Sequence, residues 1–254
     1  MSAELLEIAL EAARAAGALL LDRFGDPASG ILAKSSRTDL VSDSDRDAEA
    51  LALGIITGAR PDDAIVAEEG GGGSGRSGVT WLVDPLDGTI NYLWGVPQWS
   101  VSIAAEDAQG GLVGVVLDPC RGETFTAARG AGARLGEATL RVREGAPLAE
   151  ALIGTGFSYR AEERARQAAR LTRVLPAVRD VRRFGSAALD LAWVAAGRID
   201  GYFETGLNPW DRAAGELLVR EAGGVIEELS GSGLVAGAPG LIGPLRALLD
   251  DAGG

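Results

Sequence analysis

The chain has 254 residues, 46% of them hydrophobic, which is enough to bury a core in one large domain or two small ones and excludes disorder along the whole chain. Its 36 acidic and 24 basic residues give a net charge of −12, which disfavours a broad nucleic-acid-binding face because such a surface repels phosphate backbones. The absence of histidine excludes an imidazole base, serine–histidine triads and the usual zinc sites. Any hydrolysis must therefore use carboxylates, hydroxyls and metal ions.

The first half of the chain begins with helical spacing of apolar residues over residues 5–19, and a second such pattern follows Ser42. Two short apolar runs, Ala64–Ala67 and Val79–Val83, each end at an acidic residue and predict buried strands. The Gly/Ser-rich stretch 70–78 between them predicts a loop. Further strands of an antiparallel pattern are predicted at Trp99–Ala105, Leu112–Leu117, Glu123–Ala128 and Thr139–Val142.

From about Pro147 onward, in the second half of the chain, predicted strands alternate with predicted helices. The predicted strands are Leu152–Thr155 and Ile199–Glu204, and the predicted helices are Glu162–Val178, Ser186–Ala196 and Asp211–Ala222. The alternation indicates a second α/β unit. We therefore expect an N-terminal α+β part over residues 1–146, which carries most candidate metal ligands, and a C-terminal α/β part over residues 147–254, which completes the site.

Cellular location is indicated by what the sequence lacks. Cys120 is the only cysteine, so an intrachain disulfide is excluded and a reducing compartment is expected. The N-terminus has no basic region followed by a cleavage site, and no apolar run approaches the ~20 residues needed to cross a bilayer. These features predict a cytoplasmic protein that does not bind membranes.

The most informative segment is WLVDPLDGT, residues 81–89. A buried strand is expected to end at Asp84, Pro85 to stop it, and Asp87 with Gly88 to make a tight turn. Asp84 and Asp87 can converge across that turn, and the carbonyl of Leu86 can face the same point. Ligands that are all oxygen suit a hard ion such as Mg²⁺.

Two further carboxylates are expected at the same place. Glu68 ends the strand before Asp84, and strand ends in open sheets gather ligands. Asp211 begins a helix in the sequence PWDRAAG, residues 209–215. Bare carboxylates ~4 Å apart repel by about 4 kcal/mol per pair at an effective dielectric near 20. Divalent cations would reverse this field and admit an anionic phosphate into an acidic protein.

The turn after Asp87 supplies groups for phosphate and water. Gly88 and Thr89 can offer backbone N–H groups to phosphate where a helical turn begins. The hydroxyl of Thr89 can hold the attacking water, and a carboxylate can take the proton of a water acidified by the cation. Lys34 is the only lysine in the chain, which singles it out among the basic residues.

Each of these signals has a structural explanation when taken singly. Ser42 and Asp45 have nearly the pattern of a capping box, so Asp45 can simply favour the start of a helix. Asp211 suits a first helical turn, and Glu204 and Lys34 can be solvated surface charges. The segment from Asp84 to Gly88 can be an ordinary turn. Their occurrence together and in this order favours a functional site.

Together the segments resemble the inositol monophosphatase family. The two segments quoted above are similar to its two signatures, and RRFGSAALDLA at residues 182–192 and DGYFE at residues 200–204 are similar to its bacterial inositol-1-monophosphatase branch. The resemblance implies a layered α/β/α/β/α fold, activation by two or three Mg²⁺ ions, inhibition by lithium and a homodimer.

The same resemblance implies a role for each matching residue. The implied metal ligands are Glu68, Asp84, the carbonyl of Leu86, Asp87 and Asp211. The implied catalytic residues are Glu68, Thr89, Asp45 and Asp87, of which Glu68 and Thr89 position the water and Asp45 supports them. The implied substrate-binding residues are Leu86, Asp87, Gly88, Thr89, Gly185, Ser186, Ala187, Glu204 and Asp211, with Glu204 accepting hydrogen bonds from ring hydroxyls. Lys34 matches a family lysine near the metals.

The predicted function is hydrolysis of inositol 1-phosphate or a related polyol or sugar monophosphate. Histidinol phosphate, fructose 1,6-bisphosphate and adenosine 3′,5′-bisphosphate are alternative substrates within the same chemistry. Glu204 favours a neutral, hydroxylated leaving group, and the sequence shows no evident basic pocket for a second phosphate. A regulatory binding protein that retains the fold, and a purely structural metal site, are alternatives of another class.

Overall fold

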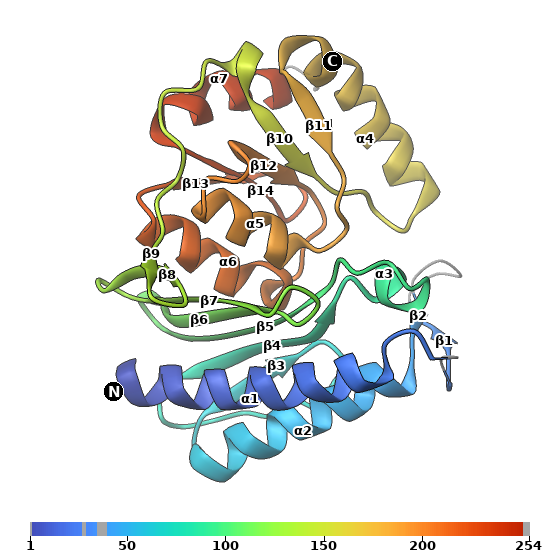
Figure 1. Ribbon diagram of the computed structural model, residues 1–254, viewed down its shortest axis with the longest axis vertical. Coiled ribbons are helices and arrows are strands. Elements are labelled where there is room, and N and C mark those ends of the chain that lie inside the picture. The colour runs from blue at the N-terminus through green and yellow to red at the C-terminus, as the bar shows by residue number, and fades with distance from the viewer. Residues whose placement is uncertain (1, 27–28, 35–39, 251–254) are drawn as a thin grey trace.

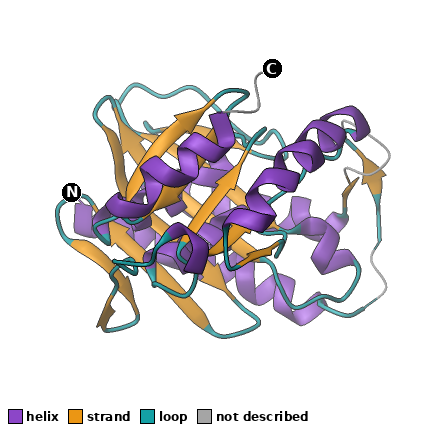
Figure 2. Cartoon of the chain, turned by 90° about the horizontal axis from the view of Figure 1, so that it is seen from above, coloured by secondary structure: helices purple, strands orange, loops and turns teal. Residues whose placement is uncertain are grey.

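The computed structural model describes residues 2–26, 29–34 and 40–250. Figure 1 shows helices and sheets stacked in alternating layers, beginning with the N-terminal helices and ending with the C-terminal ones. Figure 2 views the same stack from above, with helices lying across the strands. This α/β/α/β/α arrangement is the predicted fold class.

The first layer contains α1 (Ser2–Arg23) and α2 (Asp43–Ala59), which pack against each other and against the first sheet. The buried face of α1 is rich in alanine, as at Ala9, Ala12 and Ala16, so the helix can approach the sheet closely. The large aromatic side chains Trp81 and Trp99 fill the core beneath it.

The first sheet has the strand order β3-β4-β5-β6-β7-β8-β9. Only the β3–β4 pair is parallel, and every later pair is antiparallel. Its strands are β3 (Ala64–Ala67), β4 (Thr80–Asp87), β5 (Ser100–Asp107), β6 (Gly110–Asp118), β7 (Glu123–Ala128), β8 (Gly132–Leu135) and β9 (Ala138–Thr139). The short helix α3 (Thr89–Leu93) joins β4 to β5, and the small strands β1 (Leu32–Ala33) and β2 (Leu40–Val41) pair at the edge of the molecule.

The middle layer contains α5 (Ala187–Ala195) and α6 (Pro209–Glu221), which are covered on both sides by sheets. Because α5 is enclosed, it is apolar around nearly its whole circumference. Gly215 lets the two helices touch, since a Cβ atom at that position would lie 2.5 Å from the Cβ atom of Leu191.

The second sheet has the order β11-β10-β12-β14-β13 and is covered on its outer face by α4 (Ala161–Val174) and α7 (Pro239–Asp250). Its strands are β10 (Leu152–Thr155), β11 (Asp180–Arg182), β12 (Gly201–Glu204), β13 (Val225–Leu229) and β14 (Gly233–Gly237). Short 3₁₀ turns, η1 (Leu148–Glu150) and η2 (Leu175–Ala177), precede β10 and follow α4. The two sheets lie on either side of the expected boundary near Pro147, and the division into two parts stays a prediction.

Three predicted elements differ from the structure. The helix expected over Glu162–Val178 ends at Val174, because Pro176 cannot donate a helical hydrogen bond. The strand expected over Thr139–Val142 is shorter, since the N–H of Val142 donates to the carbonyl of Ala222 (3.1 Å) instead of to a neighbouring strand. Strand β4 does not stop at Asp84 but continues to Asp87, with a shift of register between the two.

The described residues contain no helix that is long and apolar enough to span a bilayer.

Candidate active site

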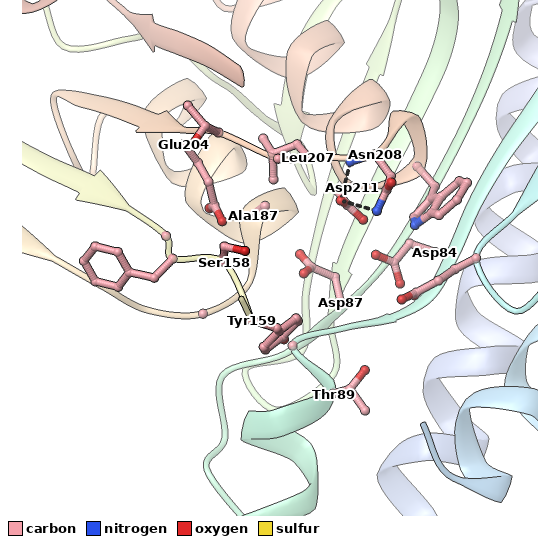
Figure 3. Close-up of a pocket in the computed structure, with 18 of the residues that line it drawn as sticks. Asp84, Asp87, Thr89, Ser158, Tyr159, Ala187, Glu204, Leu207, Asn208 and Asp211 are labelled. Atoms are coloured by element: carbon pink, nitrogen blue, oxygen red, sulfur yellow. Dashed lines mark hydrogen bonds between the residues drawn. The ribbon is translucent and has the colours of Figure 1, made fainter. Parts of the chain in front are cut away.

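A pocket of about 670 Å³ opens where the ends of strands from both sheets meet the N-terminal ends of α5 and α6 (Figure 3). Most of the predicted site residues line it: Lys34, Glu68, Asp84, Leu86, Asp87, Gly88, Thr89, Gly185, Ala187, Glu204 and Asp211. Asp45 and Ser186 are buried behind this lining and hydrogen-bond to residues in it. The structure therefore brings the candidates together around one cavity.

Glu68 and Asp84 meet because β3 and β4 run in parallel. Ala67 pairs with Val83, so the next residues, Glu68 and Asp84, lie beside each other at the point where β3 ends. The carboxyl of Asp84 hydrogen-bonds to Glu68, and its Oδ1 also accepts the N–H of Leu86 (3.0 Å). This adjacency is the arrangement predicted from the sequence.

The turn that follows Asp87 depends on Gly88. This residue has a φ of +99°, and a Cβ atom there would lie 3.0 Å from the carbonyl oxygen of Gln98. Both observations favour glycine, because other residues rarely adopt this backbone conformation and the space is taken. Gly88 starts α3 and places the backbone N–H groups of Gly88 and Thr89 beside the pocket.

Asp87 and Asp211 are held by groups from the middle layer. Asp87 Oδ2 accepts hydrogen bonds from the hydroxyl of Ser186 and the N–H of Ala188, both at 2.7 Å. Asp211 Oδ2 accepts the N–H of Asn208 at 2.7 Å, as in a capping box. Asp211 thus both caps α6 and points into the pocket (Figure 3).

The electrostatics of these acids show that positive charge is lacking. Burial, followed by the charges of Glu68, Asp87 and Asp211, raises the pKa of Asp84 well above its usual value. Burial raises the pKa of Asp87 to about 6, against the hydrogen bonds from Ser186 and Ala188, and burial likewise raises the pKa of Asp211. A cation placed among these side chains would favour their charged forms and so oppose all three shifts.

Among the described residues, Lys34 is the basic residue that pairs directly with this group of acids. Its Nζ atom lies 2.8 Å from Glu68 Oε1 and also pairs with Glu69. Burial lowers the pKa of Lys34, but the charge of Glu68 and the hydrogen bonds to both acids outweigh burial and raise it overall. Lys34 therefore stays charged, and its charge is shared between two carboxylates on the β3 side of the site.

The hydroxyl of Thr89 sits between two acceptors. It lies 3.1 Å from Asp45 Oδ1 and 3.1 Å from the carbonyl oxygen of Leu86, so its single proton points to one of them. Asp45 Oδ2 accepts both the N–H and the hydroxyl of Ser42, at 2.9 and 2.6 Å. Asp45 thus serves as the capping residue that the sequence allowed and also as a partner of Thr89. The lone pairs of Thr89 remain free to accept a hydrogen bond from a water.

The opposite side of the pocket carries Glu204, at the end of β12. Burial raises its pKa to about 7, against the hydrogen bond from Tyr202 and the charge of Arg183. Ser186 differs from its predicted role, because its buried hydroxyl is used by Asp87 and does not line the pocket. Gly185 and Ala187, on either side of it, do line the pocket.

Sequence reasoning did not assign several residues of this site. Tyr202 hydrogen-bonds to Glu204, Asp190 is buried nearby, and Arg160 and Arg183 line the pocket. Tyr202 could have been found from the sequence, because it lies two residues before the candidate Glu204 and residues two apart on a strand share a face. Asp190 could have been found too, because it is the only charged residue in an otherwise apolar helix. Arg183 and Arg160 could not, because arginines on loops are common.

The described acidic side chains of the pocket do not form a closed metal site. As the side chains lie, no group of three among the described acidic residues surrounds one point closely enough to hold an ion. The protein donors account for this, because Ser186 and Asn208 hold oxygens of Asp87 and Asp211, and Lys34 holds Glu68. The donor set still fits a hard divalent cation, because it consists of buried carboxylate oxygens that repel one another.

Comparison with known proteins decides the family. Residues 1–251 match the model of the inositol monophosphatase family. The chain belongs to this family. It is 43% identical over 244 residues to the inositol-1-monophosphatase of Mycobacterium bovis, a match that covers 90% of this chain and 84% of that protein. It is 41% identical over 256 residues to Nus factor SuhB of Escherichia coli, covering 97% and 96%.

A solved structure agrees with the fold. The crystal structure of extragenic suppressor protein suhB from Bartonella henselae superposes with a TM-score of 0.91 at 37% identity, covering 96% of this chain and 98% of that one. The layered fold and the resemblance predicted from the sequence are thereby confirmed. As a member of this family the chain is a phosphatase, and membership implies that its activity depends on a metal.

Proposed function

We propose that the chain is a Mg²⁺-dependent phosphomonoesterase that hydrolyses inositol 1-phosphate or a related polyol or sugar monophosphate. One observation carries the proposal: a single pocket has the acids Glu68, Asp84, Asp87 and Asp211 on one side and Glu204 on the other. The first group suits a cation that draws in phosphate, and Glu204 suits the hydroxyls of a leaving group. The relative from Mycobacterium bovis, named inositol-1-monophosphatase, supports this substrate.

The residues that would hold Mg²⁺ are Glu68, Asp84, the carbonyl of Leu86, Asp87 and Asp211, and we propose two or three ions. When bound, such ions neutralise the phosphate, acidify water and stabilise the departing oxygen. Freeing the carboxylates for this task requires that Lys34 and the donors on Asp87 and Asp211 share or release their hydrogen bonds. The coupling between these acids makes occupancy by a cation favourable.

Thr89 would hold the attacking water. Because its proton is directed at Asp45 or at the carbonyl of Leu86, its oxygen can only accept a hydrogen bond from that water. Glu68, at the pocket wall, is the carboxylate proposed to take the water's proton. Asp45 holds Thr89 in place and is itself fixed by Ser42.

The phosphate would lie against the start of α3, where Gly88 and Thr89 present backbone N–H groups. The leaving group would then extend toward Gly185, Ala187 and Glu204. Arg160 and Arg183 line the same pocket and carry positive charge that a second phosphate would need, which the sequence did not reveal. A bisphosphate therefore belongs in any test of specificity.

The test is a panel of phosphate esters assayed with Mg²⁺, with and without lithium. We expect inositol 1-phosphate to give the highest kcat/KM, lithium to inhibit and a chelator to abolish activity. Fructose 1,6-bisphosphate, histidinol phosphate and adenosine 3′,5′-bisphosphate complete the panel. If one of these three esters has a kcat/KM tenfold above that of inositol 1-phosphate, the side of the pocket with Glu204 recognises the leaving group of that ester instead.

A homodimer in the cytoplasm completes the proposal. The dimer rests on the family resemblance, and the compartment on the single cysteine, Cys120. Light scattering coupled to size-exclusion chromatography measures the first, and cell fractionation the second.

A second candidate is a regulatory binding protein that retains the phosphatase fold. It is favoured by the 41% identity to a protein named Nus factor SuhB. The carboxylate set is complete in this chain, as turnover requires, and a regulatory role can coexist with it. An Asp87→Asn variant separates the two, because it should lose turnover and keep any regulatory effect in cells.

A further inference from the structure

Tyr202 is a fully buried tyrosine whose hydroxyl bonds to a residue that lines the active-site pocket. It lies on β12 with 0% of its surface exposed, and its hydroxyl donates a hydrogen bond to Glu204 Oε2. The two residues are two positions apart on one strand, so their side chains project from the same face. The hydrogen bond thus links the core of the second sheet to the leaving-group side of the pocket.

The ring of Tyr202 has little freedom to move. A Cβ atom at Gly154 on β10 would lie 3.1 Å from its Cδ2 atom and 2.9 Å from Cδ1 of Ile199, so the backbone of β10 packs against the ring. Strand β12 is also held to β10, because the hydroxyl of Thr155 donates to the carbonyl of Phe203 (2.9 Å). The phenolic hydroxyl is therefore presented at a fixed position.

Glu204 is confined on two sides. Tyr202 holds Oε2, and the carboxylate lies so close to Gly156 that a Cβ atom there would collide with it. Among the described residues, Oε1 receives no hydrogen bond, although Glu204 lines the pocket. One carboxylate oxygen is thus engaged by the protein, and the other is left for a ligand.

The charges around the pair keep Tyr202 a donor. Burial, followed by the charges of Glu204 and Asp190, raises the pKa of the phenol well above its usual value, so it remains protonated. Asp190 on α5 is 1% exposed, and its Oδ1 has no hydrogen-bond partner among the described residues. Arg183 faces Glu204 from the loop after β11, and Asp87 faces it from β4.

We propose that Tyr202 is a positioning residue for substrate recognition: its hydroxyl fixes one oxygen of Glu204, so that the other accepts hydrogen bonds from hydroxyls of the leaving group. The proposal rests on the proposed function, in which Glu204 recognises a polyol. It adds that the orientation of Glu204 is imposed by the core of the second sheet and does not arise only when substrate binds.

The test compares Tyr202→Phe with wild type on inositol 1-phosphate and on 4-nitrophenyl phosphate, using the Mg²⁺-loaded enzyme. The variant removes one hydroxyl donor but leaves the Glu204 carboxylate in place, so we expect kcat/KM for inositol 1-phosphate to fall about fivefold, through KM, and kcat/KM for the aryl ester to change less than about twofold. The pH at which kcat/KM for inositol 1-phosphate rises should also increase, because the lost hydrogen bond lowers the pKa of Glu204 in the wild type.

The matched control is Tyr92→Phe, which removes another buried tyrosine hydroxyl, one that donates to the carbonyl of Leu20 (2.9 Å) and does not contact Glu204. Any loss in this variant should be the same for both substrates. The decisive variant is Tyr202→Phe combined with Glu204→Gln. If Tyr202 acts through Glu204, the double variant should match Glu204→Gln within about twofold, because the two losses are not additive.

The outcomes separate this inference from the function on which it rests. If Glu204→Gln affects both substrates equally, polyol recognition by Glu204 is wrong, and the proposed function loses its substrate class. If Glu204→Gln selectively impairs inositol 1-phosphate but Tyr202→Phe impairs neither substrate, or both equally, only the role of Tyr202 is wrong. Additive losses in the double variant would equally overturn it.

Discussion

Two groups of acids face each other across one pocket and differ in what neutralises them. The metal-side group consists of the proposed ligands Glu68, Asp84, Asp87 and Asp211, and the leaving-group side carries Glu204, with Asp190 buried near it. Burial raises pKa values in both. On the metal side the neighbours are mostly other carboxylates, whereas Glu204 has a tyrosine hydroxyl and the charge of Arg183.

The difference teaches that a raised pKa alone does not identify a metal ligand. Several carboxylates that repel one another are best relieved by a divalent cation, whereas an isolated buried carboxylate with a hydroxyl donor is relieved by one proton. The metal side should therefore respond to chelators, and the leaving-group side should respond to pH and to the identity of the leaving group. The predictions below test this division.

The largest effect is expected from Asp87→Asn. The amide keeps the volume of the side chain but removes a negative charge at the proposed metal site, so turnover should fall by about 10²–10³-fold or more. Circular dichroism and thermal denaturation should show an intact fold. Asp190→Asn is the matched control on the other side of the pocket, and its turnover should stay within about tenfold of wild type. Normal turnover in Asp87→Asn would remove this residue from the site.

Mg²⁺ binding should stabilise the protein, and only substitutions on the metal side should abolish this stabilisation. Mg²⁺ at about 100 times its Kd should stabilise the wild type by about 2.7 kcal/mol, which is roughly 5–10 °C in Tm for a chain of this size. Asp84→Asn should abolish this rise and increase the Tm of the metal-free protein, because Asp84 is 2% exposed and repelled by its neighbours. Differential scanning calorimetry with and without a chelator measures both. An unchanged response to Mg²⁺ in Asp84→Asn would contradict the ligand set.

Glu204→Gln should produce a smaller and selective loss. Hydrogen bonds to a charged group contribute about 1.5–3 kcal/mol, so kcat/KM for inositol 1-phosphate should fall about 10–100-fold, while kcat/KM for 4-nitrophenyl phosphate falls far less. The Mg²⁺-induced rise in Tm should persist in this variant. Loss of that rise would place Glu204 on the metal side and break the comparison.

The smallest effect is the pH dependence of stability. The pKa of Glu204 is about 7 in the folded protein and near 4.5 when unperturbed, so the folded state holds this proton more tightly. Its contribution to stability is complete below about pH 4.5 and is lost as the pH rises through 7. Glu204→Gln has no such loss, so the metal-free variant should gain a few degrees in Tm over wild type between pH 5 and pH 8. If the Tm of the two proteins changes with pH in the same way, the pKa of Glu204 is not raised in the folded protein.

The metal side could be predicted from the sequence because local rules place it. The parallel pairing of β3 and β4 brings Glu68, which follows β3, beside Asp84, and Asp87 lies three residues further along the same strand. The continuation of β4 past Pro85 was not predicted. It is tolerated because the ladder with β5 shifts register there, so the missing N–H of proline leaves no partner unpaired.

The leaving-group side could be predicted only in part, because it depends on packing between elements distant in the sequence. The surroundings of Glu204 come from β10, α5 and the loop before it, and no spacing rule relates these to one another. Ser186 shows the same limit. Its motif indicated a residue near substrate, but whether its hydroxyl faces the pocket or Asp87 is decided by how α5 docks on the first sheet.

The hydrogen bonds from Ser186 and Ala188 to Asp87 have a consequence for biosynthesis. These contacts join residues 99 and 101 positions apart, so the loop that closes them is long and its entropic cost is high. A nascent chain that has produced only the first sheet has Glu68, Asp84 and Asp87 but neither Asp211 nor the helix that fixes Asp87. Hydrolysis should therefore begin late, after the second sheet has emerged from the ribosome and docked.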